Sequence, residues 1–300
     1  MVGQAESVAN HAQLRRGTAV ERRRRFSLRR LATAAVQQAA LIAVSLVMIA
    51  PIYFVVITAF KTNRETSRSP WSLPEIPTLE AFRTAFERGD LLLWFRNTVI
   101  VASGSVLVVT VLALLTAYAL HGMRFPGRSL LRQMFIVLMM IPPIILVIPL
   151  FVLFARIGLV NSFLGASIVF CGLLIPFSVF LFVSFFDALP HEIIEAATLD
   201  GAGRFAILWQ IVVPLALPAV VTQLLVNLLF VWNELLVVLI FLQSDERKTL
   251  AAGITVFQGR FLRDTPLVMA ASLIVAVPMV LIYLAGQRAF LRGLTAGSLK

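Results

Sequence analysis

Residues 157–186 read IGLVNSFLGASIVFCGLLIPFSVFLFVSFF, a run of 30 residues without a charged side chain. A helix needs about 20 apolar residues to cross the hydrocarbon core of a bilayer. Helices on the surface of soluble proteins carry a polar stripe, and this run has none. Because lipid offers no hydrogen bonds to backbone groups, the run is most simply a membrane-spanning helix.

Five further runs on either side of this one are almost free of charge. They cover residues 31–60, 97–120, 133–155, 205–244 and 265–287. The run 205–244 is too long for one span, and Pro214 and Pro218 mark its beginning, which leaves a span at about 217–241. We therefore predict an all-α integral membrane protein with a six-span domain over residues 31–287. Prolines inside the spans predict kinks, at Pro142, Pro143, Pro149, Pro176 and Pro278.

The composition excludes several classes of protein. Hydrophobic residues make up 59% of the 300 residues and charged residues 14%, whereas soluble domains are about 25% charged. Intrinsic disorder requires low hydrophobicity and is excluded as well. The single cysteine, Cys171, excludes an intramolecular disulfide framework.

The net charge of +11 would suggest a nucleic-acid partner in a soluble chain. Here, eight arginines lie in residues 1–30, just before the first span. Positive charge next to a span marks the cytoplasmic side, so we expect cytoplasmic tails at 1–30 and 288–300 and no nucleic-acid partner. The first apolar run is too long for a cleaved signal peptide.

The sequence offers no pattern typical of a catalytic or metal site. His11, His121 and His191 are isolated from one another and from Cys171, so no metal or other cofactor is expected. Residues 122–129, GMRFPGRS, have the spacing of a phosphate-binding loop, but Arg128 stands where that loop has lysine. Such a loop joins a strand to a helix, whereas this segment joins two spans and is better interpreted as a basic turn. If ATP drives transport, another chain must supply the ATPase.

The segment between the fourth and fifth spans is unusual. Residues 187–204 read DALPHEIIEAATLDGAGR. Pro190 suits the first turn of a helix, Glu192 and Glu195 follow where the helix dipole favours anions, and Gly201 can adopt the left-handed conformation that ends a helix. This pattern predicts a short helix, a sharp turn and a second helix that enters the membrane. The residues alone leave two interpretations open, a plain surface linker and an element that transmits force.

This loop resembles the EAA motif of permease subunits of ATP-binding cassette (ABC) importers. The motif is Glu-Ala-Ala, three residues, Gly, nine residues, Ile, one residue and Leu-Pro, and it matches here at Glu195-Ala196-Ala197, Gly201, Ile211 and Val213-Pro214. Its one departure is Val213 in place of leucine. The form EAAxxDGA, Trp232-Asn233-Glu234, residues 269–272 (MAAS) and the C-terminal GLTAGSLK resemble the carbohydrate-uptake branch, with its maltose-type inner permeases.

The resemblance implies the type I importer fold and a set of partners. A second permease subunit, giving a heterodimer, would complete the pore, two ABC ATPase subunits would close on ATP, and an extracytoplasmic solute-binding protein would deliver a sugar or oligosaccharide. The loop 187–213 would couple to the ATPase through Glu195, Ala196, Ala197, Asp200 and Gly201. The chain would reside in a prokaryotic inner membrane as a multi-pass protein.

Glu234 is the only charged residue within a predicted span. An ionisable side chain in a membrane helix usually faces protein or water. Together with Trp232 and Asn233 it would line a sugar pathway. Two other interpretations are a structural contact with the partner subunit and a side chain that reaches the outer interface.

Two other classes of function lack their expected features. A membrane-embedded enzyme needs paired catalytic groups, and Glu234 stands alone. A self-sufficient channel or secondary transporter often carries several intramembrane charges or inverted repeats, and neither is present in the sequence. Permeases for amino acids, phosphate or peptides share the EAA loop, but the C-terminus and Trp232-Asn233-Glu234 favour sugar.

Overall fold

The computed structural model describes residues 34–260 and 264–296. By its internal contacts the chain divides into two units, Met1–Ile57 and Thr58–Lys300. The first unit contributes most of a helix, Ala34–Ala59, which is long and apolar enough to cross a membrane. The predicted N-terminal tail, residues 1–30, lies outside the described residues.

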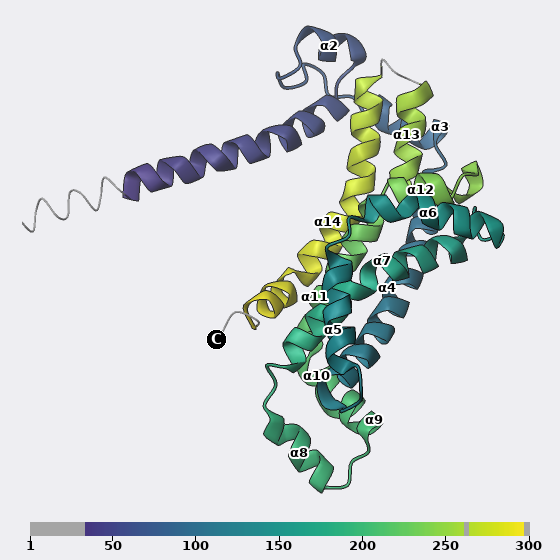
Figure 1. Cartoon of the computed structure of the whole chain (residues 1–300). Helices are drawn as coiled ribbons and strands as arrows, with labels where there is room; N and C mark the ends of the chain where they lie inside the picture. The colour runs from purple at the N-terminus through teal and green to yellow at the C-terminus, as the bar shows by residue number, and fades with distance from the viewer. Residues whose placement is uncertain (1–33, 261–263, 297–300) are drawn as a thin grey trace, which may run out of the picture. The chain divides into compact units, whose positions relative to one another are not determined.

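The second unit consists of helices and connecting loops over its described residues (Figure 1). The helices are α2 (Asn63–Arg68), α3 (Glu80–Arg88), α4 (Leu91–Gly122), α5 (Arg128–Met139), α6 (Pro143–Arg156), α7 (Phe163–Phe186), α8 (His191–Leu199), α9 (Arg204–Ile207), α10 (Val213–Leu215), α11 (Leu217–Asn233), α12 (Leu236–Phe241), α13 (Leu250–Arg260) and α14 (Thr265–Ala296). A π-helix, η1 (Leu208–Val212), joins α9 to α10, and a 3₁₀ turn, η2 (Asp245–Arg247), precedes α13. The all-α prediction is confirmed.

The predicted spans divide into straight and broken helices. Four helices could each cross a membrane alone: Ala34–Ala59, α4, α7 and the first part of α14, Thr265–Gln287. Two further pairs pass the same test together but are bent, α5 with α6 by 101° and the segment Arg204–Leu215 with α11 by 76°. The described part of the chain therefore contains four such helices, or up to six spans if each bent pair counts as one.

The kink that Pro142 and Pro143 predict in the third span is confirmed, because α5 and α6 are separated by a 101° bend. The chain leaves the helix between α5 and α6, and Pro142 has an extended backbone with ψ of 127°. Residues that precede a proline avoid the helical region, and a proline has no N–H to donate. Two successive prolines, Pro142 and Pro143, therefore break this span, whereas Pro149 and Pro176 stay inside continuous helices.

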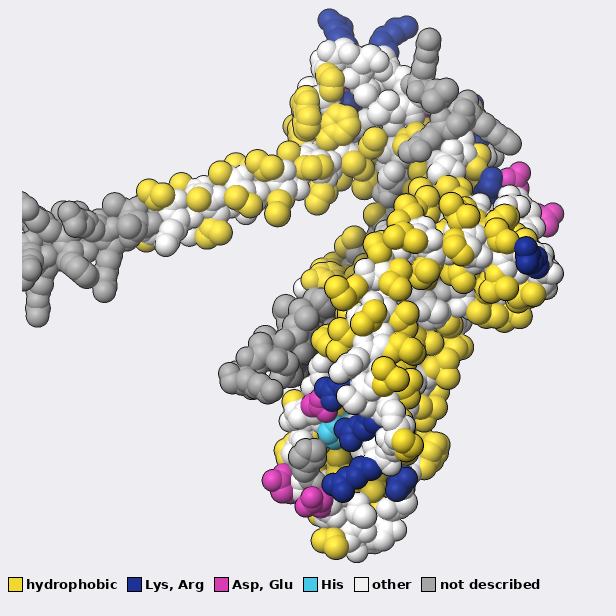
Figure 2. Space-filling view, in the orientation of Figure 1, with side chains coloured by type: hydrophobic (Ala, Val, Ile, Leu, Met, Phe, Trp, Pro, Cys, Tyr) yellow, Lys and Arg dark blue, Asp and Glu magenta, His cyan; other side chains and the backbone are white. Residues whose placement is uncertain are grey.

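The core of the second unit lies where α4, α7 and α11 pack together. Hydrophobic side chains cover much of the middle of its visible face, and charged side chains gather toward the two ends (Figure 2). This distribution matches a body with its middle in lipid and its ends in water. The predicted C-terminal tail begins as helix, because α14 continues to Ala296.

A small polar network is buried inside this apolar core. Thr110 of α4, Ser178 of α7, and Gln223 and Asn227 of α11 are all buried, the last three with no exposed surface. Ser178 Oγ accepts from Asn227 Nδ2 at 2.8 Å and from Gln223 Nε2 at 3.3 Å, and Thr110 Oγ1 lies 2.8 Å from Gln223 Oε1. Hydrogen bonds of this kind join three helices that otherwise pack through apolar contacts.

Candidate functional site

The loop between α7 and α11 has the predicted form of a helix, a sharp turn and a second helical segment. Helix α8 begins after Pro190 and ends before Asp200. Gly201 N–H donates to Thr198 O at 3.1 Å, and Ala202 N–H donates to Ala197 O at 3.0 Å. This pair of bonds is the Schellman arrangement, which requires a left-handed residue after the helix. Gly201 supplies it with a φ of +82°.

Helix α8 has one packed face and one free face. Ala197 is 9% exposed and, with Ile194, packs into the core cluster around Phe182, Phe186 and Ile207. The side chains of Glu195, Ala196 and Asp200 are exposed. The five residues predicted for coupling are therefore neighbours on one short element, but Ala197 fastens α8 to its own subunit while the exposed residues face outward.

The second helical segment continues this packing toward the membrane. Ile207, Leu208 and Val212 are buried in the same core cluster as Ala197. The π-helix η1 ends at Val212, two residues before Pro214, which has no N–H to donate to a carbonyl of the preceding turn. The chain then turns by 76° into α11. The loop is thus connected to a membrane helix through a short, packed and sharply bent segment.

Asp187, at the start of the loop, is bound by one residue of α4 and one residue of α5. Its Oδ1 lies 2.9 Å from His121 Nδ1 at the end of α4, and its Oδ2 pairs with the Arg132 guanidinium of α5. Burial raises the pKa of the Asp187 carboxyl, but the hydrogen bonds from His121 and Arg132 outweigh it and the pKa is lowered from its usual value. This carboxylate belongs to the loop's acidic group, Asp187, Glu192, Glu195 and Asp200, but its two oxygens are already engaged.

The three residues predicted for a sugar pathway occupy different environments. Trp232 is 3% exposed, and its Nε1 donates to Val275 O of α14 at 3.1 Å. Asn233 is exposed and ends α11. Glu234 follows with extended backbone, and its Oε1 accepts from the N–H groups of Leu236 and Val237 at 3.0 and 3.2 Å.

Glu234 therefore lies at a break between α11 and α12, which divides the span predicted at about 217–241. The first turn of α12 has unpaired N–H groups, and the carboxylate satisfies two of them. The sequence contains one indication of this break, which is the charge of Glu234 itself, because a charge is costly inside an unbroken membrane helix.

The connection from α12 to α13 is held by two asparagines from other segments. Asn161, with a φ of +57°, accepts at its Oδ1 from Ser244 N and Oγ at 3.1 Å each. Asn97 Nδ2 donates to the carbonyls of Glu246 and Lys248 at 2.8 and 2.9 Å. These bonds fix the start of the segment 244–264, which connects the fifth and sixth spans.

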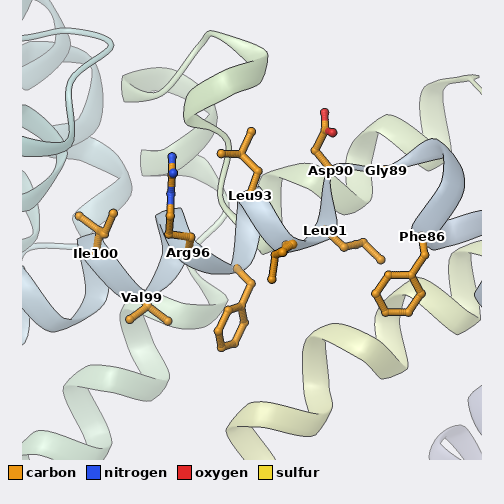
Figure 3. A pocket seen from close by; sticks show the side chains of 10 residues that line it. Phe86, Gly89, Asp90, Leu91, Leu93, Arg96, Val99 and Ile100 are labelled. Atoms are coloured by element: carbon orange, nitrogen blue, oxygen red, sulfur yellow. The ribbon is translucent and has the colours of Figure 1, made fainter.

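An open groove of about 790 Å³ runs along the α3–α4 junction. Its lining is mostly apolar, and the charged side chains of Asp90 and Arg96 point to the opposite side of α4 from Phe86 and Val99 (Figure 3). The described residues hold no group of three or more His, Cys, Asp or Glu side chains that could bind a metal ion.

Comparison with known proteins gives this arrangement a context. Residues 109–292, more than half of the chain, match the family model "Binding-protein-dependent transport system inner membrane component". The chain belongs to this family. It is a multi-pass membrane component of an ABC transporter, and the permease subunits of this family have no catalytic activity of their own.

Sequence alignments with two bacterial permeases extend over most of this chain. The inner membrane ABC transporter permease protein YcjP of Escherichia coli is 34% identical over 258 residues, which are 83% of this chain and 90% of that protein. The melibiose/raffinose/stachyose import permease protein MelC of Bacillus subtilis is 32% identical over 251 residues, 83% of this chain and 91% of that protein.

A solved structure shows the same fold. It is the crystal structure of a bacterial ABC transporter involved in the import of the acidic polysaccharide alginate, with a TM-score of 0.75 and 22% sequence identity. The match covers 86% of this chain and 96% of that chain. The expected type I importer permease fold is therefore confirmed.

Sequence reasoning missed two polar clusters in this permease. One is the group formed by His121, Arg132 and Asp187, and the other is the buried network around Ser178. Each cluster joins side chains from helices that are far apart in sequence, such as Ser178 with Gln223 and Asn227, and His121 with Asp187. The only signal in the sequence was the position of His121, Arg132 and Asp187 at the ends of adjacent apolar runs, which places them on one side of the membrane.

Proposed function

We propose that this permease is the membrane subunit of an ATP-driven importer for a sugar or oligosaccharide, in which it forms half of the translocation pore. The observation that carries the proposal is the loop 187–213, which holds a capped helix with one free face at the end of the membrane bundle. The sugar class is supported by relatives such as the melibiose/raffinose/stachyose permease. The role that we assign to this loop is coupling to a separate ATPase, because α8 presents exposed side chains that a partner can contact.

Helix α8 is the element that contacts the ATPase in this proposal. Glu195, Ala196 and Asp200 are exposed, so a partner surface can reach them. Small side chains let that surface approach closely, and the carboxylates pair with basic groups on it. Gly201 provides the tight turn that ends α8, and Ala197 keeps α8 packed on its own subunit.

The full transporter would contain a second permease, giving a heterodimer, two ABC ATPase subunits and an extracytoplasmic solute-binding protein. The family is named for its dependence on a binding protein, which supports the last of these. The arginine-rich N-terminus supports an orientation in which both termini and α8 are cytoplasmic. The loop 244–264 would then face outward.

Asn233 and Glu234 are the residues that we assign to the sugar pathway. Asn233 is exposed, and Glu234 is partly exposed at a break between two helices. Broken helices in transporters place polar groups at the cavity. Trp232, whose indole is packed against Val275 and Phe95, would position this break.

Reconstitution tests the proposal. The permease is co-expressed with the permease, ATPase and binding-protein genes that neighbour its own, and calorimetry identifies the sugar that the binding protein holds. Proteoliposomes then report uptake of that labelled sugar with and without ATP. ATP-dependent uptake that requires this chain supports the proposal, and a binding protein specific for amino acids, phosphate or peptides contradicts the sugar class.

The orientation has its own test. Alkaline phosphatase, which is active only outside the cytoplasm, is fused after Lys300 or within residues 61–90. We expect an inactive enzyme at the C-terminus and an active one in the loop, and the reverse pattern would contradict the assigned orientation.

A further inference from the structure

The carboxylate of Asp187 joins the coupling loop to the α4–α5 connection through both of its oxygens. One oxygen contacts His121 Nδ1 at 2.9 Å, and the other pairs with the Arg132 guanidinium. Arg128 Nη2 in turn donates to the carbonyl of His121 at 3.0 Å. A carboxylate held by an arginine and a histidine is a charge-assisted contact, which is stronger and more directional than a neutral one.

The surroundings of His121 make this contact rigid. Its side chain is only 5% exposed, and its ring lies edge-on to the fully buried ring of Phe186, with centroids 6.2 Å apart. Phe186 stacks on Phe182 in the same core cluster that holds Ala197 of α8. The imidazole therefore has little freedom to leave Asp187 while this cluster stays packed.

Arg132 connects the same carboxylate to a broken span. It lies on α5, which bends by 101° into α6. Phe151 and Phe154 of α6 both contact the buried ring of Phe241 in α12, with centroids 6.1 and 5.6 Å apart. Helix α12 is the helix whose first turn is capped by Glu234.

We propose that Asp187, His121 and Arg132 form a strut that transmits movement of α8 to the broken span α5–α6, and through Phe241 to the break at Glu234. The strut rests on the proposed coupling function of α8. Its three members are positioning residues that touch neither the sugar nor ATP. Coupling between distant sites is carried by packed side chains, ion pairs and rigid helices, and variants of these three residues test whether this set carries it.

The test is made on the assembled transporter in proteoliposomes, with sugar uptake and ATP hydrolysis measured together. Asp187→Asn and Arg132→Gln each break the ion pair. We expect sugar moved per ATP to fall by about tenfold, within the usual range of coupling free energies, while ATP hydrolysis and the amount of assembled complex are retained. The double exchange Asp187→Arg with Arg132→Asp restores an opposite pair, and we expect it to recover most of the lost coupling.

Arg124→Gln is the matched control, because Arg124 is an exposed arginine in the same connection, and we expect normal uptake from it. Unchanged uptake per ATP in both single variants would overturn the strut. A parallel loss of uptake, ATP hydrolysis and assembled complex would overturn it in favour of a purely structural contact. Failure of the wild-type complex to transport would instead contradict the proposed function.

Discussion

Ser178 Oγ lies 2.8 Å from Asn227 Nδ2, and both side chains are completely buried between α7 and α11. The same hydroxyl also accepts from Gln223 and donates to the carbonyl of Leu174. One small side chain therefore satisfies two amide groups in an environment where water and lipid offer them little. Its removal leaves both amides without this acceptor.

We expect Ser178→Ala to destabilise the permease by about 1 kcal/mol, the order found for hydrogen bonds between membrane helices. The change in unfolding temperature is measured by heating the purified protein in detergent and using size-exclusion chromatography to quantify the protein that remains folded. Ser103→Ala is the matched control, because Ser103 is exposed and bonds only within α4. Equal unfolding temperatures for the two variants would contradict the role given to the network.

Gly253 is the position in α13 where a side chain has least room. A β-carbon there would lie 2.1 Å from Trp94 Cε3, on a ring that is 4% exposed and cannot move away freely. We expect Gly253→Ala to lower the unfolding temperature clearly, because overpacking typically costs about 1–3 kcal/mol. Gly172→Ala is the control. Its β-carbon meets nothing within 4 Å, so helix propensity should leave that variant neutral or slightly more stable.

Substitutions at Gly201 can distinguish the effect of backbone strain from the effect of a changed contact surface. A β-carbon at Gly201 meets nothing within 4 Å, so the positive φ of +82° is the only internal obstacle. Asparagine and aspartate both tolerate this conformation. We therefore expect Gly201→Asn to insert and keep measurable uptake, and Gly201→Asp to insert but abolish uptake, because it adds a charge beside the exposed face of α8.

Uptake in vesicles with equal amounts of inserted protein compares these variants. Gly203→Ala is the control, since Gly203 has an ordinary φ of −70° and open space around its β-carbon, and we expect it to transport normally. Normal transport by Gly201→Asp would show that this turn does not face the ATPase.

Glu234 caps the first turn of α12 and also carries a negative charge. Two substitutions distinguish these two roles. Glu234→Gln keeps an oxygen that can accept from Leu236 and Val237 N–H, whereas Glu234→Ala removes it. We expect the glutamine variant to keep its stability but change the affinity or rate of sugar uptake. The alanine variant should also lose about 1 kcal/mol of stability, as for other caps. Unchanged uptake kinetics in Glu234→Gln would remove Glu234 from the pathway.

Because of Asp187, the free energy of unfolding of the permease should depend on pH in the acidic range. Its pKa in the folded protein is lowered by His121 and Arg132, against the effect of burial. The ionised contact contributes in full above the pKa of an unfolded aspartate, about 3.9. This contribution is lost as the pH falls through that value toward the lower folded pKa.

We therefore expect the wild type to lose more stability than Asp187→Asn when unfolding temperatures are measured from about pH 6 down to about pH 3. The difference between the two proteins should be constant at the upper end of this range and shrink at the lower end. Parallel curves over the whole range would show that this carboxylate gains no net stabilisation from its partners.

Local sequence signals predicted the elements of the fold but not the contacts of Asp187. Pro190 and Gly201 act on their own stretch of backbone, so the helix and turn of the coupling loop could be read directly. Asp187, by contrast, counted as one of four acidic residues on that loop. Its partner His121 lies 66 positions earlier in the chain, and only the packing of α4 against α7 brings the two side chains together.

The sequence by itself determined which segments can lie in lipid, because a charge or an unpaired backbone group is costly there and its absence over 20 or so residues is visible in one chain. It also determined the form of the loop 187–213 and the presence of a kink at Pro142 and Pro143. Only the tertiary structure decided that this kink has an angle of 101°, that the Trp232 indole donates to the carbonyl of Val275, and that Glu234 caps a new helix. Those outcomes depend on which helix faces lie against one another. When nearly every face of a helix is apolar, the sequence pattern does not predict which face contacts a neighbouring helix.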